Sequence, residues 1–354
     1  MKNQRISFLL ITLFLLFCLI PSLGMLVLGP SPLLANESAS RTPALRNRDG
    51  SFNTELLSDT SDYIGTRFAL RPYLVSARSF LYEKLLHSSA ENQVTLGENG
   101  ELYYSSTLDD YAGLGLTDTE LEQIAQHLRD IQDAAEASGS RFLFTVAPNK
   151  NTIVPEGMPA RFPAGHDSSN YARLLPLLEK HGVHFVDLTT ALTEQPELYY
   201  RTDSHWTAEG AAIAADALLC ALDRESGYGA GPFASEGTHI GDLYQMLYPT
   251  GKGRESETVY VPGFTHQTES DPRGGNAMTI LTNSSSGTGT LYCRRDSFGI
   301  ALYPYLADAF AEAEFSRSAD YSVSAFSAIE TDAVILEIVE RNLPLLLPTE
   351  DSAA

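Results

Sequence analysis

Apolar residues are concentrated at the start of the chain. From Ile6 to Leu28 the sequence holds 23 residues without a charge. At roughly 1.5 Å per residue, a helix of that length crosses the roughly 30 Å hydrocarbon core of a bilayer. Lys2 and Arg5 precede this run, and no basic residue follows it until Arg41. Because loops rich in basic residues stay in the cytoplasm, the pattern predicts a membrane helix with the rest of the chain outside.

A cleaved signal peptide is the alternative interpretation of residues 1–28. The sequence Leu33-Leu34-Ala35 makes a poor cleavage site, because small residues are preferred at the first and third positions before the cut. We therefore favour a retained anchor, and either interpretation places the working part of the protein outside the cytoplasm. Residues 29–44 are mostly small or polar and include several prolines, so we expect them to form a linker.

Beyond the linker, helical spacing alternates with short apolar runs. Thr117 and Glu120 form a capping box before a helix with one apolar stripe, and His127 lies off that stripe, which predicts a surface histidine. Such alternation indicates an α/β fold in which helices cover both faces of a parallel sheet, giving three layers. The other predicted helices and strands cover residues 169–180, 207–222, 141–147, 183–188, 291–293, 300–313 and 333–339.

One stretch breaks this alternation. Residues 225–289 are rich in Gly, Ser, Thr and Pro, and their short apolar runs predict an irregular β insertion. We expect one domain over residues 45–345 that contains this insertion, followed by a flexible tail over residues 346–354.

Composition and charge limit the classes of function. The chain has 24 Lys plus Arg against 45 Asp plus Glu, a net charge of −21, which excludes nucleic-acid binding through a basic surface. The three cysteines are too few for a disulfide scaffold and lack zinc-site spacing. We expect Cys220 and Cys293 to lie close together, as two buried thiols in preference to a disulfide.

Candidate chemistry follows the predicted strands. In open parallel sheets the ligand site lies beyond the carboxyl ends of the strands. The residues at those points supply a hydroxyl, an imidazole, carboxylates and cations: Asn149-Lys150, Asp203-Ser204-His205, Arg295-Asp296-Ser297 and Glu340-Arg341.

Asp203 and His205 stand directly before a predicted helix and beside Trp206, the only tryptophan. His205 can take a proton from a serine hydroxyl while Asp203 orients the ring, which is the logic of nucleophilic catalysis. Two alternatives remain open: both residues only cap the helix, or they form an Asp-x-His metal pair. Trp206, with Tyr199, Tyr200 and Phe298, either stacks on sugar rings or belongs to the core.

Ser297 is the candidate nucleophile because it ends a strand and begins a helix. The first backbone N–H groups of a helix are unpaired and can stabilise an oxyanion. The alternative is an ordinary N-cap serine, with Asp296 bracing the turn.

The segment Thr202-Asp203-Ser204-His205-Trp206-Thr207-Ala208-Glu209-Gly210 resembles the TDxHWTxxGA motif of the DHHW and alginate O-acetyltransferase-like (AlgX/AlgJ-type) branch of the SGNH hydrolases. Segments that agree in order are Asn47-Arg48-Asp49-Gly50, Val146-Ala147-Pro148-Asn149-Lys150, Gly241-Asp242-Leu243, Arg295-Asp296-Ser297-Phe298 and Glu340-Arg341. Because the Asp/His loop precedes the serine, the resemblance implies a circularly permuted SGNH fold.

The resemblance also implies roles for the site residues. Ser297 is the nucleophile, His205 the base and Asp203 its orienting partner, while Arg341 stabilises the oxyanion or holds substrate. Asn149, Lys150 and Trp206 are further candidates for substrate binding. Two departures stand out: Glu101 replaces a frequent tryptophan, and no asparagine occupies the usual oxyanion position.

The implied activity is O-acetyl transfer to an extracellular polysaccharide through an acyl-serine, without a metal or cofactor. A separate multispanning membrane acyltransferase would supply the acetyl group. Two alternatives stay open: a carbohydrate acetyl esterase with the same triad, and a sugar-binding scaffold in which the serine is silent. Without Lys2 and Arg5 the charge becomes −23, which favours a neutral or locally cationic glycan.

Overall fold

The structure is a computed structural model that describes residues 2–34, 37, 40–162, 169–193, 195–269 and 279–348. Parts of the expected linker and insertion (35–36, 38–39 and 270–278) and most of the expected tail (349–354) lie outside the described residues. The chain forms two compact units, Met1–Val94 with Asp242–Gly253, and Thr95–Gly241 with Arg254–Ala354. The second unit begins at Thr95, whereas the sequence placed the start of the domain at residue 45.

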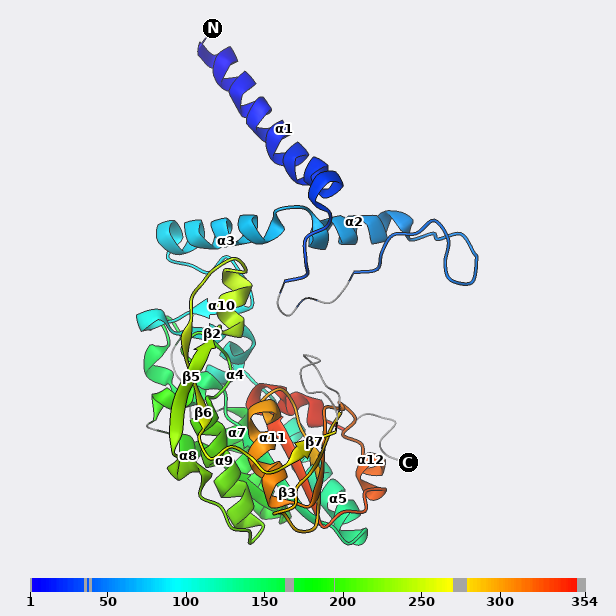
Figure 1. Cartoon of the computed structure of the whole chain (residues 1–354), viewed down its shortest axis with the longest axis vertical. Coiled ribbons are helices and arrows are strands. Elements are labelled where there is room, and N and C mark those ends of the chain that lie inside the picture. The colour runs from blue at the N-terminus through cyan, green and yellow to red at the C-terminus, as the bar shows by residue number, and fades with distance from the viewer. Residues whose placement is uncertain are drawn as a thin grey trace. The chain divides into compact units, whose positions relative to one another are not determined.

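The first unit is helical. The helices of this unit are α1 (Lys2–Leu28), α2 (Leu56–Arg67), α3 (Arg71–Leu81) with a π-helical turn at Tyr82–Leu86, and α10 (Asp242–Leu247) (Figure 1). Within the described residues, a single helical segment, Gln4–Leu28 of α1, is long and apolar enough to cross a membrane.

The second unit is built on a mixed sheet with strand order β4-β3-β11-β9-β10-β8-β7. The first five strands are parallel, and β8 and β7 add an antiparallel edge. Its strands are β3 (Arg141–Ala147), β4 (Phe185–Asp187), β7 (Gln267–Thr268), β8 (Thr279–Asn283), β9 (Thr290–Arg294), β10 (Glu312–Ser316) and β11 (Ala333–Val339).

Two apolar layers cover this sheet. One packs α9 and α11 against it, and the other packs α5, α7 and α12, so the expected three-layer arrangement is confirmed (Figure 1). The helices are α4 (Leu108–Tyr111), α5 (Asp118–Ala137), α6 (Lys150–Ile153), α7 (Asn170–His181), α8 (Thr189–Leu192), α9 (Ala208–Ala221), α11 (Gly299–Ala309) and α12 (Val323–Ser327).

Local signals located the helix starts well. Thr117 and Glu120 form the expected capping box of α5, and Thr207 caps α9 by accepting from the Gly210 N–H. His127 was wrongly expected at the surface: it is buried, and its Nε2 lies 2.8 Å from the Tyr321 carbonyl oxygen. That carbonyl is far away in sequence, so the helical pattern of α5 gave no sign of it.

Three other expectations need correction. The predicted helix over 300–313 ends at Ala309, because its last residues enter β10, a strand that the pattern did not predict. The insertion is not wholly irregular, since β7 and β8 join the main sheet and β5 (Phe233–His239) pairs with β6 (Glu255–Tyr260). Cys293 is buried as expected, but Cys220 is exposed at the end of α9, and both thiols are free.

Candidate active site

Two adjacent parallel strands bring the serine and its neighbours to one edge of the sheet. β9 ends at Arg294, opposite Leu336 of β11, so the loop with Ser297 lies beside the segment that follows β11. The Asp/His loop is closed by a bridge between Tyr199 and Trp206 and by the Tyr200 N–H, which donates to the His205 carbonyl at 3.2 Å. Main-chain pairing therefore fixes the backbone at His205.

The structure brings the three expected residues into one line of hydrogen bonds. His205 Nε2 lies 2.9 Å from Ser297 Oγ, and His205 Nδ1 lies 2.7 Å from Asp203 Oδ1. The His205 N–H also donates to Asp203 Oδ1 at 2.9 Å. Because both ring nitrogens have these partners, the geometry favours proton transfer at Ser297 over the Asp-x-His metal pair.

A second histidine, which sequence reasoning missed, holds the other oxygen of Asp203. His239, at the end of β5, places Nε2 2.7 Å from Asp203 Oδ2 and stacks on Tyr200 with ring centroids 4.1 Å apart. Burial lowers the pKa of His239, but the hydrogen bond and charge of Asp203, with Glu257 and Glu255, raise it above its ordinary value overall. In the sequence, only the nearness of His239 to the Gly241-Asp242-Leu243 segment could have pointed to this role.

The hairpin of the insertion supports the same loop from its other strand. Glu255, which pairs with His239 across β5 and β6, accepts from the N–H groups of Arg201 and Thr202, each at 2.7 Å. The insertion therefore supplies two side chains that orient the residues before and at Asp203.

Asp296 braces the turn that carries Ser297, as the sequence suggested. Its Oδ1 accepts from the Phe298 N–H at 2.9 Å and its Oδ2 from the Val339 N–H at 2.6 Å. Its own N–H donates to Glu337, a fully buried acid whose pKa is raised by burial and by the charge of Asp296. α11 begins one residue after Phe298, and the Ser297 carbonyl accepts from the Ile300 N–H at 3.2 Å, so Ser297 lies at the start of this helix.

Trp206 is part of the core. It is 1% exposed, its Nε1–H donates to the Phe298 carbonyl at 3.2 Å, and its ring meets the Phe298 ring edge-on at 5.0 Å. The Phe298 ring lies 4.8 Å from the His205 ring. Trp206 thus steadies the residue that follows Ser297, and of the two alternatives that the sequence left open it belongs to the core.

Arg341 contacts the ring of Phe298, the residue that follows Ser297. Its guanidinium carbon is 5.5 Å from the Phe298 ring centroid and 5.3 Å from that of Tyr104, and the residue is half-buried. Cations over aromatic faces are attracted by the ring quadrupole. The two rings therefore hold a positive charge beside the nucleophile turn.

Lys150 is turned away from solvent. It is 4% exposed, and its Nζ lies 2.7 Å from Glu101 and donates to the carbonyl oxygens of Leu102 and Arg201 at 2.9 and 2.6 Å. Burial lowers the pKa of Lys150 and Glu101 opposes that shift. Glu101, which departs from the resembled motif, is thus the counter-ion of a buried lysine, and this arrangement leaves no donor of Lys150 for substrate.

Asn149 lines a cavity at the carboxyl end of β3. This cavity of about 170 Å³ is lined by residues of α4, α6, α7 and the ends of β3, β4 and β11, among them Asn149 and Glu340. The Asn149 N–H donates to Glu340 Oε2 at 2.8 Å, and its buried Oδ1 has no hydrogen-bond partner in the described part of the chain. Burial, with the charge of Asp110, raises the pKa of Glu340 to about 7.

Several known proteins share this fold. A solved structure of Bacillus cereus PatB1 with a sulfonyl adduct has a TM-score of 0.55 at 14% identity, covering 72% of this chain and 98% of that one. A DHHW family protein from Eubacterium siraeum has a TM-score of 0.51 at 16% identity, covering 72% of this chain and 95% of that one. At such identities the likeness concerns the fold alone, which is of the SGNH type.

Sequence comparison points the same way. The probable alginate O-acetylase AlgJ of Pseudomonas syringae pv. tomato is 29% identical over 136 residues, or 38% of this chain and 34% of AlgJ. The alginate biosynthesis protein AlgX of that organism is 24% identical over 165 residues, or 42% of this chain and 33% of AlgX. The chain thus spans about a third of these relatives' length.

A family model described as the SGNH hydrolase-like domain of the acetyltransferase AlgX matches residues 94–299, more than half of the chain, including Asp203, His205 and Ser297. The chain therefore belongs to this AlgX-type SGNH hydrolase-like family.

Proposed function

We propose that this protein is an O-acetyltransferase that modifies a polysaccharide through an acetyl-Ser297 intermediate. The observation that carries the proposal is the hydrogen-bonded line from Ser297 through His205 to Asp203. Family membership, and relatives named as alginate O-acetylases, support acetyl transfer as the reaction.

The geometry supports a two-step reaction. Ser297 Oγ attacks the carbonyl carbon of an acetyl donor while His205 Nε2 takes the hydroxyl proton, and the proton then passes to the leaving group. In the second step a sugar hydroxyl loses its proton to His205 and attacks the acetyl carbon, which regenerates Ser297. Asp203 stabilises the imidazolium in both steps.

Arg341 is our candidate for the oxyanion or substrate contact. The Phe298 N–H, a donor expected from the start of the helix, already donates to Asp296. The cation lies over the rings of Phe298, which follows Ser297, and Tyr104, and in our proposal it faces the negative oxygen of the tetrahedral intermediate. Arg341→Ala should lower kcat by about 10²- to 10³-fold. Arg341→Lys serves as its matched control: partial recovery supports the charge, and activity unchanged in both variants contradicts the role.

We also propose a location, an acceptor and a donor. α1 anchors the chain, and the catalytic unit lies outside the cytoplasm, where a separate multispanning acyltransferase presents the acetyl group. The net charge of −21 opposes approach of a polyanion such as alginate. We therefore expect a neutral or locally cationic acceptor.

Acetyl release from an activated ester, measured with and without glycans of different charge, tests the function. Acetylated glycan together with Ser297 dependence supports the transferase, and neutral glycans should outperform alginate. Acetate alone, at the same rate with every glycan, would establish the esterase in its place. A serine-directed fluorophosphonate should label the wild type and Ser235→Ala, a control on exposed β5, but not Ser297→Ala. An unlabelled wild type favours the scaffold.

A further inference from the structure

Helix α2 lacks the packing that normally keeps a short helix folded. None of its 12 residues, all of them described, is buried. Isolated helices of about 12–15 residues or fewer are marginal in water, and most helices in proteins depend on packing of an apolar face. α2 therefore requires a surface to lie against.

Helix α3 turns its polar side toward the protein. Ser79 is its buried residue, and Ser76 Oγ lies 2.9 Å from the Thr250 hydroxyl, within the same unit. In the π-helical turn that follows, Glu83 accepts a hydrogen bond from the Tyr248 hydroxyl. The hydrogen bonds of this side are made by hydroxyls and a carboxylate, beside the half-buried Pro72 and Val75.

The apolar side of α3 and its π-helical turn faces outward. Tyr73 is 65% exposed, Phe80 53%, Leu81 52% and Leu85 71%. Their spacing of seven, eight and twelve residues from Tyr73 puts them on one helical face. On α2, Leu57 is 86% exposed and Ile64 is 47% exposed. We call these six residues the outer face.

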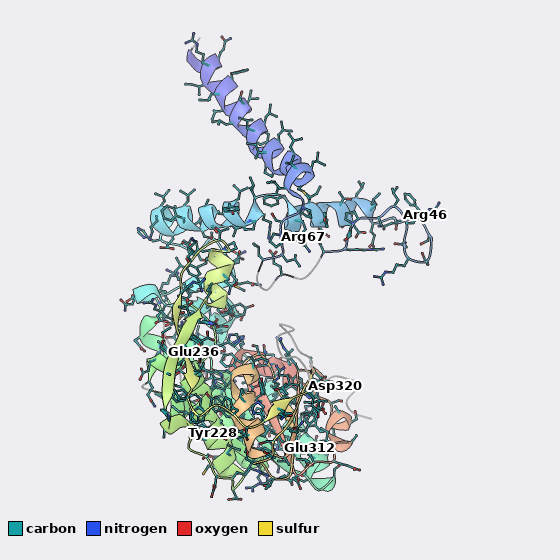
Figure 2. The ribbon with its side chains drawn as sticks, viewed as in Figure 1. Arg46, Arg67, Tyr228, Glu236, Glu312 and Asp320 are labelled. Atoms are coloured by element: carbon teal, nitrogen blue, oxygen red, sulfur yellow. The ribbon has the colours of Figure 1, made fainter. Side chains whose placement is uncertain are left out.

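The outer face is tied to the end of the candidate membrane helix. Ser31, three residues after α1, donates its N–H to the Arg67 carbonyl at 2.9 Å and accepts from Arg67 Nη1 at 3.0 Å. Arg67, labelled in Figure 2, is the last residue of α2. A Cβ on Gly24 of α1 would lie 2.8 Å from the Ala69 Cβ. The junction of α2 and α3 is thus fixed where α1 would leave a bilayer.

We propose that α2, α3 and Tyr82–Leu86 lie in the lipid–water interface, with the outer face against the lipid surface. Aromatic and aliphatic side chains on one face of a helix are the pattern of interfacial helices, and tyrosines favour the headgroup level. The inference rests on the proposed membrane anchoring by α1, and continuity with that helix argues for lipid over a protein partner. We call these helices in that position the interfacial platform.

The experiment uses the full chain with Cys18→Ser and Cys220→Ser, reconstituted in liposomes of phosphatidylethanolamine and phosphatidylglycerol. An environment-sensitive fluorophore is attached to one new cysteine at a time, and quenching by lipids that carry doxyl groups at shallow or deep positions gives its depth. The sites are Phe80→Cys on the outer face, Leu23→Cys in α1 and Leu114→Cys, a 73% exposed control in the second unit.

We expect Leu23→Cys to be quenched by deep doxyl groups, Phe80→Cys by shallow ones, and Leu114→Cys by neither. Leu81→Asp in the Phe80→Cys chain should reduce the shallow quenching several-fold. Quenching at position 23 without quenching at position 80 overturns the interfacial platform and assigns the outer face to a protein partner. Quenching at neither position overturns the anchoring and the platform together. Acetyl transfer by the same samples reports separately on the proposed function.

Discussion

Two regions of the molecule differ in the kind of group that they bury. One is the sheet edge that carries Ser297, and the other consists of the helices α2 and α3. In the two loops that carry the candidate triad, the buried aspartates meet partners within the chain: Asp203 pairs with two histidines, and Asp296 accepts from two backbone N–H groups. On α2 and α3, large apolar side chains are exposed, and Ser76 of α3 and Glu83 of the turn after it hydrogen-bond to the protein.

The difference shows which region has its partners within the chain and which needs a partner outside it. Buried polar groups stabilise a fold only when their hydrogen bonds are made, so the sheet edge is organised before any substrate arrives. An exposed apolar face gains free energy only by leaving water, so the outer face needs a second surface. The predictions below test how far each region depends on partners outside itself.

The largest effect should come from the nucleophile. Ser297→Ala removes the attacking oxygen and leaves the surrounding hydrogen bonds of Asp296 and Asp203 in place. We expect kcat to fall by about 10⁴-fold or more with little change in the melting temperature. Single-turnover acetyl transfer and thermal unfolding measure the two quantities. Substantial activity in this variant would contradict the assignment of Ser297.

A pair of truncations compares the two regions directly. Trp206→Ala empties a site in the core and should cost about 3–5 kcal/mol of unfolding free energy. Phe80→Ala on the outer face should change it by about 0.5 kcal/mol or less in detergent-free buffer. Urea denaturation of both variants decides the matter, and similar losses would mean that the outer face is packed against protein.

Glu340 predicts a dependence of stability on pH at the sheet edge. Its pKa, about 7 in the folded state, lies above the ordinary value of 4.5, so the folded chain binds more protons than the unfolded chain between these values. The free energy of unfolding should therefore fall as pH rises through this window, by on the order of 3 kcal/mol. Glu340→Gln should flatten that slope, and a parallel slope in both proteins argues against it.

The smallest expected effect concerns His239. The pKa of His239 is raised by its hydrogen bond to Asp203 Oδ2 and by the charge of Asp203. When His239 is protonated, its positive charge weakens the support that Asp203 gives to an imidazolium at His205. His239→Asn retains a donor but removes the charge, so the acid limb of kcat/KM should move up by about 0.5–1 pH unit. A purely structural role would lower the rate without moving the limb.

Predictions from sequence worked where the physical cause is local. The capping box at Thr117 and the N-cap at Thr207 depend on bonds within one turn, so α5 and α9 begin where expected. The residues of the candidate triad could also be proposed from the sequence, because residues that follow parallel strands meet at one edge of the sheet. The structure brings Asp203, His205 and Ser297 together as that rule requires.

Other features depend on contacts between distant segments. His239 and Glu255 lie in a stretch without periodic pattern, and only pairing of β5 with β6 brings them to the Asp203 loop. Lys150 was a candidate for substrate binding. Its position in the sequence does not reveal that Glu101 is its counter-ion. The sequence left Trp206 open between sugar stacking and the core, since its neighbour Phe298 lies far along the chain.

The sequence by itself determined the apolar N-terminal segment, the three-layer α/β class, the family motif and the residue types available for acyl transfer. Only the tertiary structure decided which of those side chains are free to act and which are buried supports. The physical reason is that helix and strand patterns report bonds and burial within one element. The partner of a buried lysine, aspartate or tryptophan is set by packing between elements, as is the direction in which α3 presents its apolar face.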